Sequence, residues 1–227
     1  MTAHDEFFKF PSTPHIAWLA AGSPRADKVL DLDDAKAMLD GGVIVEEKVD
    51  GANLGISVDG SGGFCVQNRG TILGPGAHPQ FQPLWGWLAA REERLRAALG
   101  TGLILFGEWC FAVHSIRYTR LPDWFLGFDV YDRTAGRFWS TRRRDALLEA
   151  LGIEGVPRVG AGRFTMEGLV ALLGSSGLTE GPLEGVYVRQ EDEDWLLDRA
   201  KLVRGEFVQS IEEHWRTRKL EKNALAR

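Results

Sequence analysis

A lysine followed closely by an Asp-Gly pair is the feature of this sequence with the clearest chemical potential. It lies in EEKVDGAN, residues 46–53, where Lys48 ends a run of β-branched and acidic residues that is typical of a strand. A strand-end lysine can act as a covalent nucleophile where burial or a nearby cation lowers its pKa. Gly51 would let a phosphate approach the backbone, and Asp50 and Asn53 would supply polar ligands. Lys-x-Asp-Gly by itself is a weak motif, and its alternative is an exposed lysine before a turn.

Three further segments place a functional side chain at the end of a predicted strand or within one. Arg69, in Asn-Arg-Gly, suits recognition of a phosphate or a ribose, or is a solvated turn residue. Glu108 ends an apolar strand, where a carboxylate is costly unless it binds a ribose hydroxyl or a metal, or emerges into water. Phe128, in FLGFDVYD (residues 125–132), is either a core residue or a ring that stacks on a base, with Asp129 beside it.

An acid and a lysine lie on two predicted strands that form a hairpin later in the chain. Glu184 opens the strand of residues 183–189, and Lys201 lies in the partner strand, residues 195–203. An acid that binds Mg²⁺ and a lysine that binds phosphate, on paired strands, suit phosphoryl transfer. The alternative for this pair is an exposed, salt-bridged hairpin.

These residues must be positioned by short strands and a few helices, which the apolar periodicity indicates. Thr141 is expected to cap one helix, and the spacing of Phe207, Ile211 and Trp215 predicts that the last helix docks by one apolar stripe. The pattern indicates an α+β fold of antiparallel sheets with flanking helices. Strands are predicted at 43–48, 54–58, 64–68, 103–111, 124–131, 137–139, 183–189 and 195–203, and helices at 33–40, 84–99, 141–151, 166–173 and about 206–223.

Length and composition narrow the class of protein. The chain has 227 residues, of which 44% are hydrophobic and 26% charged, and this balance is average for one globular domain. No apolar run approaches about 18 residues, and residues 1–10 lack the pattern of a secretory signal, so we expect a cytoplasmic protein. The two cysteines exclude a disulfide framework and an all-cysteine metal site. The net charge of −5 argues against a positive coat that wraps nucleic acid, but it allows a local basic site.

Taken in order, the six segments resemble the nucleotidyltransferase motifs of the covalent polynucleotide ligase and capping-enzyme superfamily. The segments are KVDG, NRG, FGE, FDV, EGVYVR and AKLVR, and the match covers Val43 to Phe207. The segment KLVRGEF, residues 201–207, is similar to the end of the catalytic domain in the T4 RNA ligase 2 family, where a phenylalanine follows the lysine at the same spacing. The ordered set is much more specific than any one of its members.

The resemblance implies a three-step, ATP-dependent joining of RNA ends. Lys48 would attack the α-phosphate of ATP to form lysyl-AMP and release pyrophosphate. AMP would then pass to the 5′-phosphate of an RNA end, and a 3′-hydroxyl would displace it. Lys201 would bind the α-phosphate and, together with Mg²⁺ (or Mn²⁺ as its substitute), lower the pKa of Lys48. Glu184 would support the metal through water, and Asp129 would be a further metal ligand.

The resemblance also implies which residues bind the nucleotide, and one position departs from the family pattern. Val203 stands where the last motif often carries a second lysine, and Arg204 falls on the opposite face of a strand, so phosphate binding rests more heavily on Lys201. The implied contacts are adenine for Glu47 and Phe128, a ribose hydroxyl for Glu108, the ribose or the 5′-phosphate for Arg69, and the phosphates or their metal for Asp50 and Asn53.

The chain is expected to be a single adenylyltransferase domain, residues 1–227. The 23 residues after Arg204 are too few for an OB-fold or a helical domain that grips a nicked duplex. The 47 residues before Lys48 are short for the extra domain of NAD-dependent ligases, so ATP is the expected cofactor. A minimal RNA ligase or the sealing subunit of an RNA repair system fits this layout. Contacts that bind the RNA would come from an end-healing or RNA-binding partner protein, or from the tail cations Arg216, Arg218, Lys219 and Lys222.

Three alternatives stay open on the sequence. A DNA ligase or a mixed DNA and RNA ligase of the same fold would carry the same motifs, because RNA is distinguished from DNA by contacts to the 2′-hydroxyl. A nucleotide-binding module that no longer catalyses is the second alternative, and an unrelated acidic domain with chance motifs is the third. His15, which precedes the matched region, is expected to be structural.

Overall fold

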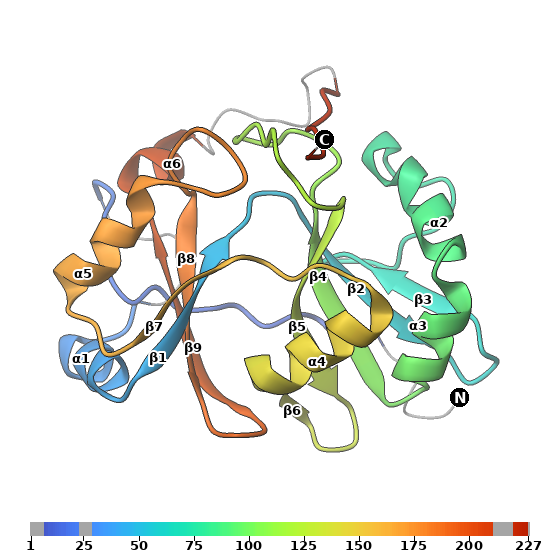
Figure 1. Ribbon diagram of the computed structural model, residues 1–227, viewed down its shortest axis with the longest axis horizontal. Helices are drawn as coiled ribbons and strands as arrows, with labels where there is room; N and C mark the ends of the chain where they lie inside the picture. The colour runs from blue at the N-terminus through green and yellow to red at the C-terminus, as the bar shows by residue number, and fades with distance from the viewer. Residues whose placement is uncertain (1–6, 23–28, 211–219, 227) are drawn as a thin grey trace.

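The computed structural model describes residues 7–22, 29–210 and 220–226 of the chain, and this part has an α+β fold (Figure 1). Its helices are α1 (Leu32–Asp40), α2 (Gln82–Ala89), α3 (Glu92–Leu99), α4 (Thr141–Leu151), α5 (Met166–Ala171) and α6 (Gly205–Ser210). Its strands are β1 (Val43–Lys48), β2 (Ala52–Val58), β3 (Phe64–Gln67), β4 (Leu103–Trp109), β5 (Phe125–Asp132), β6 (Arg137–Phe138), β7 (Arg158–Gly162), β8 (Gly185–Glu191) and β9 (Leu196–Val203).

The strands form two antiparallel sheets that lie side by side in Figure 1. The first sheet has the order β7-β1-β8-β9, and the second has the order β3-β2-β4-β5-β6. The chain crosses from the first sheet to the second between Lys48, the last residue of β1, and Ala52, the first residue of β2. The strand-end lysine singled out in the sequence therefore lies where the two sheets are joined.

Each sheet buries one face under helices, as the period-two pattern of its strands requires. In the first sheet, β1, β8 and β9 pack Val45, Val188 and Leu202 against α1 and α5. In the second sheet, β2 and β4 pack Leu54 and Leu105 against α2, α3 and α4. A third cluster includes Phe10, Phe106 and Phe128 and fills the space next to the opposite face of the second sheet. Burying each large side chain of this kind is worth about 1.5–3 kcal/mol.

The elements differ from the sequence predictions at three places. The helix predicted at 84–99 is two helices, α2 and α3, which are separated where Arg91 turns to pair with Asp123 at 2.8 Å. Strand β7, RVGAG, was not predicted, because its glycines carry little strand propensity and only pairing with β1 makes it a strand. Ser140, and not Thr141, caps α4, since the Thr141 hydroxyl donates to Glu191 instead.

The predicted helix at 206–223 is wrong at its end. Helix α6 is described from Gly205 to Ser210, and residues 220–226 are not helical but form bridges from Lys222 to Ala112 and from Leu225 to Leu121. This segment forms its backbone hydrogen bonds with a loop and not within itself. The predicted stripe residues Ile211 and Trp215, and the tail cations Arg216, Arg218 and Lys219, lie outside the described residues.

The helices of the described residues are too short or too polar to cross a membrane.

Candidate active site

The ammonium group of Lys48 contacts the carboxylate of Glu184, which precedes the neighbouring strand β8. The register pairs Lys48 with Gly185, so the two charged side chains emerge beside each other. The Lys48 side chain keeps 21% of its surface exposed, whereas that of Glu184 keeps 5%. A Cβ on Gly185 would lie 2.3 Å from the carbonyl oxygen of Leu202, so glycine is required where β8 meets β9. The Glu-Gly pair thus provides both the contact with Lys48 and the close packing of the strands.

The second sheet brings Asn53 and Glu108 to the crossing between the sheets. These residues face each other across β2 and β4, and Glu108 Oε1 accepts the backbone N–H of Gly51 at 3.1 Å. A Cβ on Gly51 would lie 2.7 Å from the carbonyl oxygen of Trp109, so the close approach of the chain at this point requires glycine. The Asp-Gly-x-Asn pattern therefore places an amide and a carboxylate next to the strand-end lysine.

Asp50 is held in place by the loop of residues 110–121. Its Oδ2 accepts the backbone N–H groups of Ser115 and Ile116 at 2.7 and 2.8 Å. Its own backbone N–H donates to the hydroxyl of Tyr118 at 2.8 Å. The Asp50 charge raises the pKa of Glu108, so it belongs to the same electrostatic cluster.

Acids outweigh cations around Lys48 in this structure. Burial would lower the pKa of Lys48, but the neighbouring negative groups, Glu184 first, outweigh burial and raise it. Burial raises the pKa of Glu184 to about 7 and that of Glu108 to about 8, although the Lys48 charge opposes both shifts. The lowered pKa expected for Lys48 is therefore not found here. The charge of Lys201 acts on Glu184, whose pKa it lowers, and so favours the anion that holds the Lys48 proton.

Lys201 is on the same face of the first sheet as Lys48. Tyr187 pairs with Glu46 on one side and with Lys201 on the other, and directly paired residues point to the same face. The Lys48 ammonium lies 6.0 Å from the centre of the Tyr187 ring. Arg204, by contrast, donates its Nε–H to the carbonyl of Leu183, in keeping with its expected place on the other face.

Three sequence-predicted residues lie in surroundings other than those expected. Glu47 points to the opposite face of β1 from Lys48 and accepts the hydroxyl of Ser176 at 2.6 Å, because neighbouring residues of a strand alternate. Asp129, expected to be a metal ligand, accepts hydrogen bonds from two arginines, one to each carboxylate oxygen, at 2.7 Å. Phe128 is buried and packs edge-on against Phe10, with ring centres 5.4 Å apart.

Two further sequence-predicted residues, Arg69 and His15, have clear positions relative to Lys48 and its neighbours. Arg69 is exposed in the turn after β3, and its charge lowers the pKa of Glu108, so it faces the same cluster. His15 is buried, its ring lies edge-on to Trp18 at 4.9 Å, and its backbone forms a bridge with Lys201. These contacts agree with the expected structural role of His15.

Three buried acceptor atoms of the predicted site have no hydrogen-bond partner among the described residues: Glu47 Oε2, Asn53 Oδ1 and Glu184 Oε2. An unsatisfied buried polar atom costs about 1–3 kcal/mol. Glu184 contacts Lys48, and Asn53 pairs with Glu108, whose charge acts on Lys48. Both unsatisfied atoms therefore belong to the surroundings of Lys48, where a bound ligand would find acceptors.

The RNA ligase family model matches residues 41–203, which is most of the chain. This chain belongs to the RNA ligase family. The match begins just before β1 and ends with β9, so it includes both sheets and the segments that carry Lys48 and Lys201. No curated protein matches the chain.

Solved structures of RNA ligases share the fold of this ligase-family chain, which is the nucleotidyltransferase fold. Naegleria gruberi RNA ligase with PPi has a TM-score of 0.61 and 19% identity, over 91% of this chain and 65% of that one. A lysine mutant of the same enzyme with ATP and Mn has a TM-score of 0.63 and 18% identity, over 90% and 64%. An archaeal ATP-dependent RNA ligase has a TM-score of 0.58 and 20% identity, over 86% and 48%. The chain therefore spans less than two thirds of the length of these ligases.

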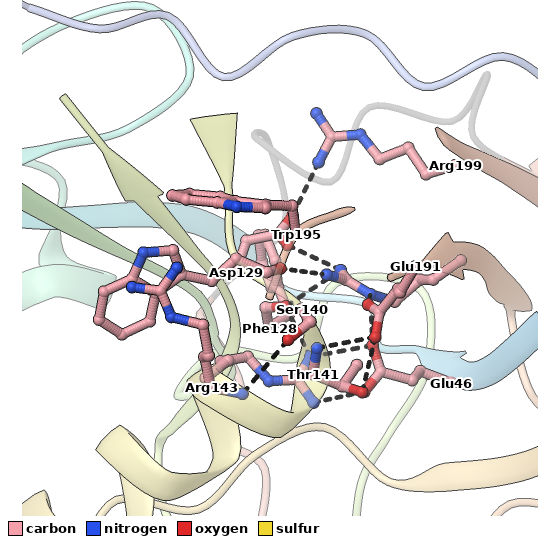
Figure 2. A network of polar contacts seen from close by, with 12 residues as sticks. Glu46, Phe128, Asp129, Ser140, Thr141, Arg143, Glu191, Trp195 and Arg199 are labelled. Carbon is pink, nitrogen blue, oxygen red and sulfur yellow. Dashed lines mark hydrogen bonds and ion pairs between the residues drawn. The ribbon is translucent and has the colours of Figure 1, made fainter. Parts of the chain in front are cut away.

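A buried ion network that sequence reasoning missed joins the two sheets of this ligase-family domain (Figure 2). Arg144 on α4 holds the Glu46 carboxylate with two hydrogen bonds, of 3.0 and 2.6 Å, and also donates to the carbonyl of Phe128 at 2.7 Å. Glu46 lies on β1 and Phe128 on β5, so one guanidinium group connects both sheets.

A second pair of arginines extends this network from the first sheet. Arg189 on β8 pairs with Asp129 at 2.7 Å and with Glu191 at 2.6 Å, and Arg199 on β9 pairs with Asp129 at 2.7 Å. At the edge of the network, the half-exposed Asp145 pairs with Arg144 at 2.6 Å and with Arg158 at 3.1 Å. Four carboxylates (Glu46, Asp129, Asp145 and Glu191) therefore face four guanidinium groups (Arg144, Arg158, Arg189 and Arg199), and the charges of these groups balance. The sequence carried a partial signal, since Glu46 and Lys48 share a strand face and Arg189 lies in the EGVYVR motif. Arg144, inside a run of three arginines, had no such signal.

Proposed function

We propose that this chain is an ATP-dependent RNA ligase that forms lysyl-AMP at Lys48, transfers AMP to a 5′-phosphate end and joins that end to a 3′-hydroxyl. The observation that carries the proposal is the contact of a strand-end lysine with a buried carboxylate, Glu184, whose Oε2 has no hydrogen-bond partner in the part of the chain that the structure describes. Membership of the RNA ligase family supports it. ATP is supported by a structural neighbour solved with ATP and Mn, and by an archaeal neighbour that is ATP-dependent.

In the first step, the Nζ of Lys48 forms a bond to the α-phosphorus, and the bond to the bridging oxygen of the β-phosphate breaks, so pyrophosphate leaves. Lys48 must lose its proton before it attacks, and the surrounding acids raise its pKa in this structure. Binding of the nucleotide therefore has to change the balance around Glu184. Lys201, on the same sheet face, is placed to stabilise the negative charge that develops on the α-phosphate.

A divalent metal fits this site through Glu184, whose Oε2 is buried without a partner among the described residues. The described residues contain no group of three or more His, Cys, Asp or Glu side chains able to hold a metal ion. Mg²⁺ usually keeps several waters and binds one or two carboxylates together with substrate phosphates, which agrees with a water-mediated role for Glu184. When bound, the cation would neutralise phosphate charge and oppose the proton on Lys48.

The remaining residues of the cluster would orient the nucleotide. Glu108, whose pKa is about 8, would accept a ribose hydroxyl in its ionised form or donate to it in its protonated form. Asn53 would bind the phosphates, and Arg69, exposed at the edge of the cluster, the ribose or the 5′-phosphate of the RNA. Phe128 would stack on adenine once its ring, which is buried edge-on against Phe10 in this structure, is accessible to the nucleotide. Glu47 would reach the adenine edge only through its backbone, because its side chain is on the other face of β1.

The second and third steps need an RNA end held in line with lysyl-AMP. Affinity for RNA comes mainly from phosphate contacts, and this chain has a net charge of −5. An end-healing or RNA-binding partner protein would supply additional phosphate contacts. We therefore expect the chain alone to adenylate itself better than it seals broken strands.

The intact mass after incubation with ATP and Mg²⁺ tests the proposal. The wild-type protein should gain the mass of one AMP, and Lys48→Ala should gain none while keeping its circular dichroism spectrum. Lys36→Ala, which removes an exposed lysine on α1, is the matched control and should label like the wild type. Label on Lys48→Ala, or no adduct on the wild type, would contradict the proposal.

Strand joining is tested with nicked duplexes that carry a 5′-phosphate. Substituting DNA for RNA on either side of the nick separates an RNA ligase from a DNA or mixed ligase. RNA on at least one side should be required, and equal sealing of an all-DNA nick would refute the RNA assignment.

A further inference from the structure

Residues 220–226 pack along the loop of residues 110–121, far from them in the sequence. Figure 1 shows this dark red end of the chain beside the green loop. Five backbone hydrogen bonds join the two segments, including Asn223 N–H to the carbonyl of Phe111 at 3.0 Å and Ala224 N–H to the carbonyl of Tyr118 at 2.9 Å. Leu220 packs against the large hydrophobic cluster of the second sheet. The segment is thus an integral part of the described domain.

The side chain of Asn223 is at the centre of this contact. It is 5% exposed, and its Oδ1 accepts the backbone N–H of Tyr118 at 2.8 Å. Its Nδ2 donates to the carbonyl oxygens of Cys110 and Ala112 at 2.8 and 3.1 Å. One amide therefore satisfies three backbone groups at both ends of the loop, a demand that aspartate or alanine could not meet.

The loop fixed by Asn223 is the loop that holds Asp50. Ser115 and Ile116 donate their N–H groups to Asp50 Oδ2, and the Tyr118 hydroxyl accepts the Asp50 N–H. Asn223 therefore reaches Asp50 through Tyr118, whose backbone it binds and whose side chain binds Asp50. Asp50 follows Lys48 by two residues.

We infer that Asn223 is a positioning residue for adenylation, which sets the place of Asp50 beside Lys48 through the loop of residues 110–121. The inference rests on the proposed function, since it concerns the chemistry of Lys48. A reacting group that moves by about 1 Å can cost about a hundredfold in rate. Asn223→Ala should therefore slow the adenylation rate constant by roughly 10- to 100-fold at saturating ATP. The affinity for ATP should change much less, because Asn223 does not itself reach the nucleotide-binding cluster.

Two further variants separate positioning from a general loss of stability. Tyr118→Phe removes the hydroxyl that accepts the Asp50 N–H but keeps the contact with residues 220–226, and it should reproduce the slow adenylation. Ser140→Ala is the matched control, because it removes a buried side chain that caps α4 away from this loop. It should lower the melting temperature and leave the adenylation rate constant near the wild-type value.

Hydrogen exchange of the Ser115 and Ile116 amides reports the position of the loop without any catalysis. Both amides should exchange faster in Asn223→Ala than in the wild type, whereas in Ser140→Ala they should exchange at the wild-type rate. Normal protection of these amides in Asn223→Ala would overturn the link to Asp50, and so would an unchanged adenylation rate constant. Equal slowing in Ser140→Ala would show that lost stability is the cause. A wild-type protein that forms no adduct would instead refute the proposed function, and the exchange result would still decide whether Asn223 fixes the loop.

Discussion

Replacing Glu46 by glutamine should destabilise the domain severely, although the two side chains have the same shape. Glu46 and Arg144 are each 2% exposed in their side chains, and their two hydrogen bonds are 3.0 and 2.6 Å long. In addition, the Nε of Arg189 lies 3.8 Å from Oε2 of Glu46. Glutamine removes the negative charge that two buried guanidinium groups face, and neither of them can lose its proton in compensation.

Breaking a buried ion pair by removing one partner usually costs about 3–5 kcal/mol of the free energy of unfolding. Arg144 keeps the half-exposed Asp145 at 2.6 Å, so we expect the loss to lie at the lower end of that range. Domains of this kind are stable by only about 5–15 kcal/mol, so the loss is a large part of the total. With a urea dependence of about 2 kcal/mol per molar, the unfolding midpoint should fall by about 2 M. The fluorescence of the eight tryptophans can follow the transition.

Asp194→Asn is the matched control, because it makes the same chemical change in an ion pair whose side chains are 61% and 54% exposed. Asp194→Asn should lower the free energy of unfolding by less than about 1 kcal/mol. The double variant Glu46→Met with Arg144→Met should recover part of the loss, since it removes both charges of the pair together. The reasoning is refuted if Glu46→Gln unfolds within about 1 kcal/mol of the wild type, or if Asp194→Asn costs as much.

Three other predictions follow from the site. The pKa of Glu108 is raised from 4.5 to about 8 by burial, so without nucleotide the melting temperature should fall as the pH rises through this window. Glu108→Gln should make the profile less steep, while Glu184, whose pKa is about 7, keeps part of the slope. A flat wild-type profile would contradict the shift. Lys201→Ala should reduce the adenylation rate constant, measured by single-turnover labelling, about a hundredfold or more. A variant that loses only affinity for ATP would rule out a role of Lys201 in the transition state. Asp129→Asn should lower the melting temperature because Arg189 and Arg199 lose a shared partner. The metal concentration needed for half-maximal adenylation should stay unchanged. A large rise in that concentration would instead support Asp129 as a metal ligand.

The sequence by itself determined the local elements and the order of the chemical groups. Alternation and turn residues are properties of neighbouring residues, so β1 from Val43 to Lys48 and α4 up to Leu151 were predicted with their observed ends. The motif order, from Lys48 to Lys201, also indicated the family that the RNA ligase family model later matched. The strand period further implied that Glu47 and Lys48 point to opposite faces, although the resemblance assigned both to the nucleotide.

Only the tertiary structure decided which charges meet. Asp129 and Arg199 are separated by 70 positions, and Tyr118 and Asn223 by 105, yet each pair is in contact. The spacing of residues along one strand does not say which strand lies beside it, or which loop covers its end. The same holds for β7, which is a strand because β1 pairs with it, and for residues 220–226, which are not helical because the loop of residues 110–121 takes their hydrogen bonds. Burial then raised the pKa values of Glu184 and Glu108 beside Lys48, because desolvation depends on the whole assembled domain and not on any one segment.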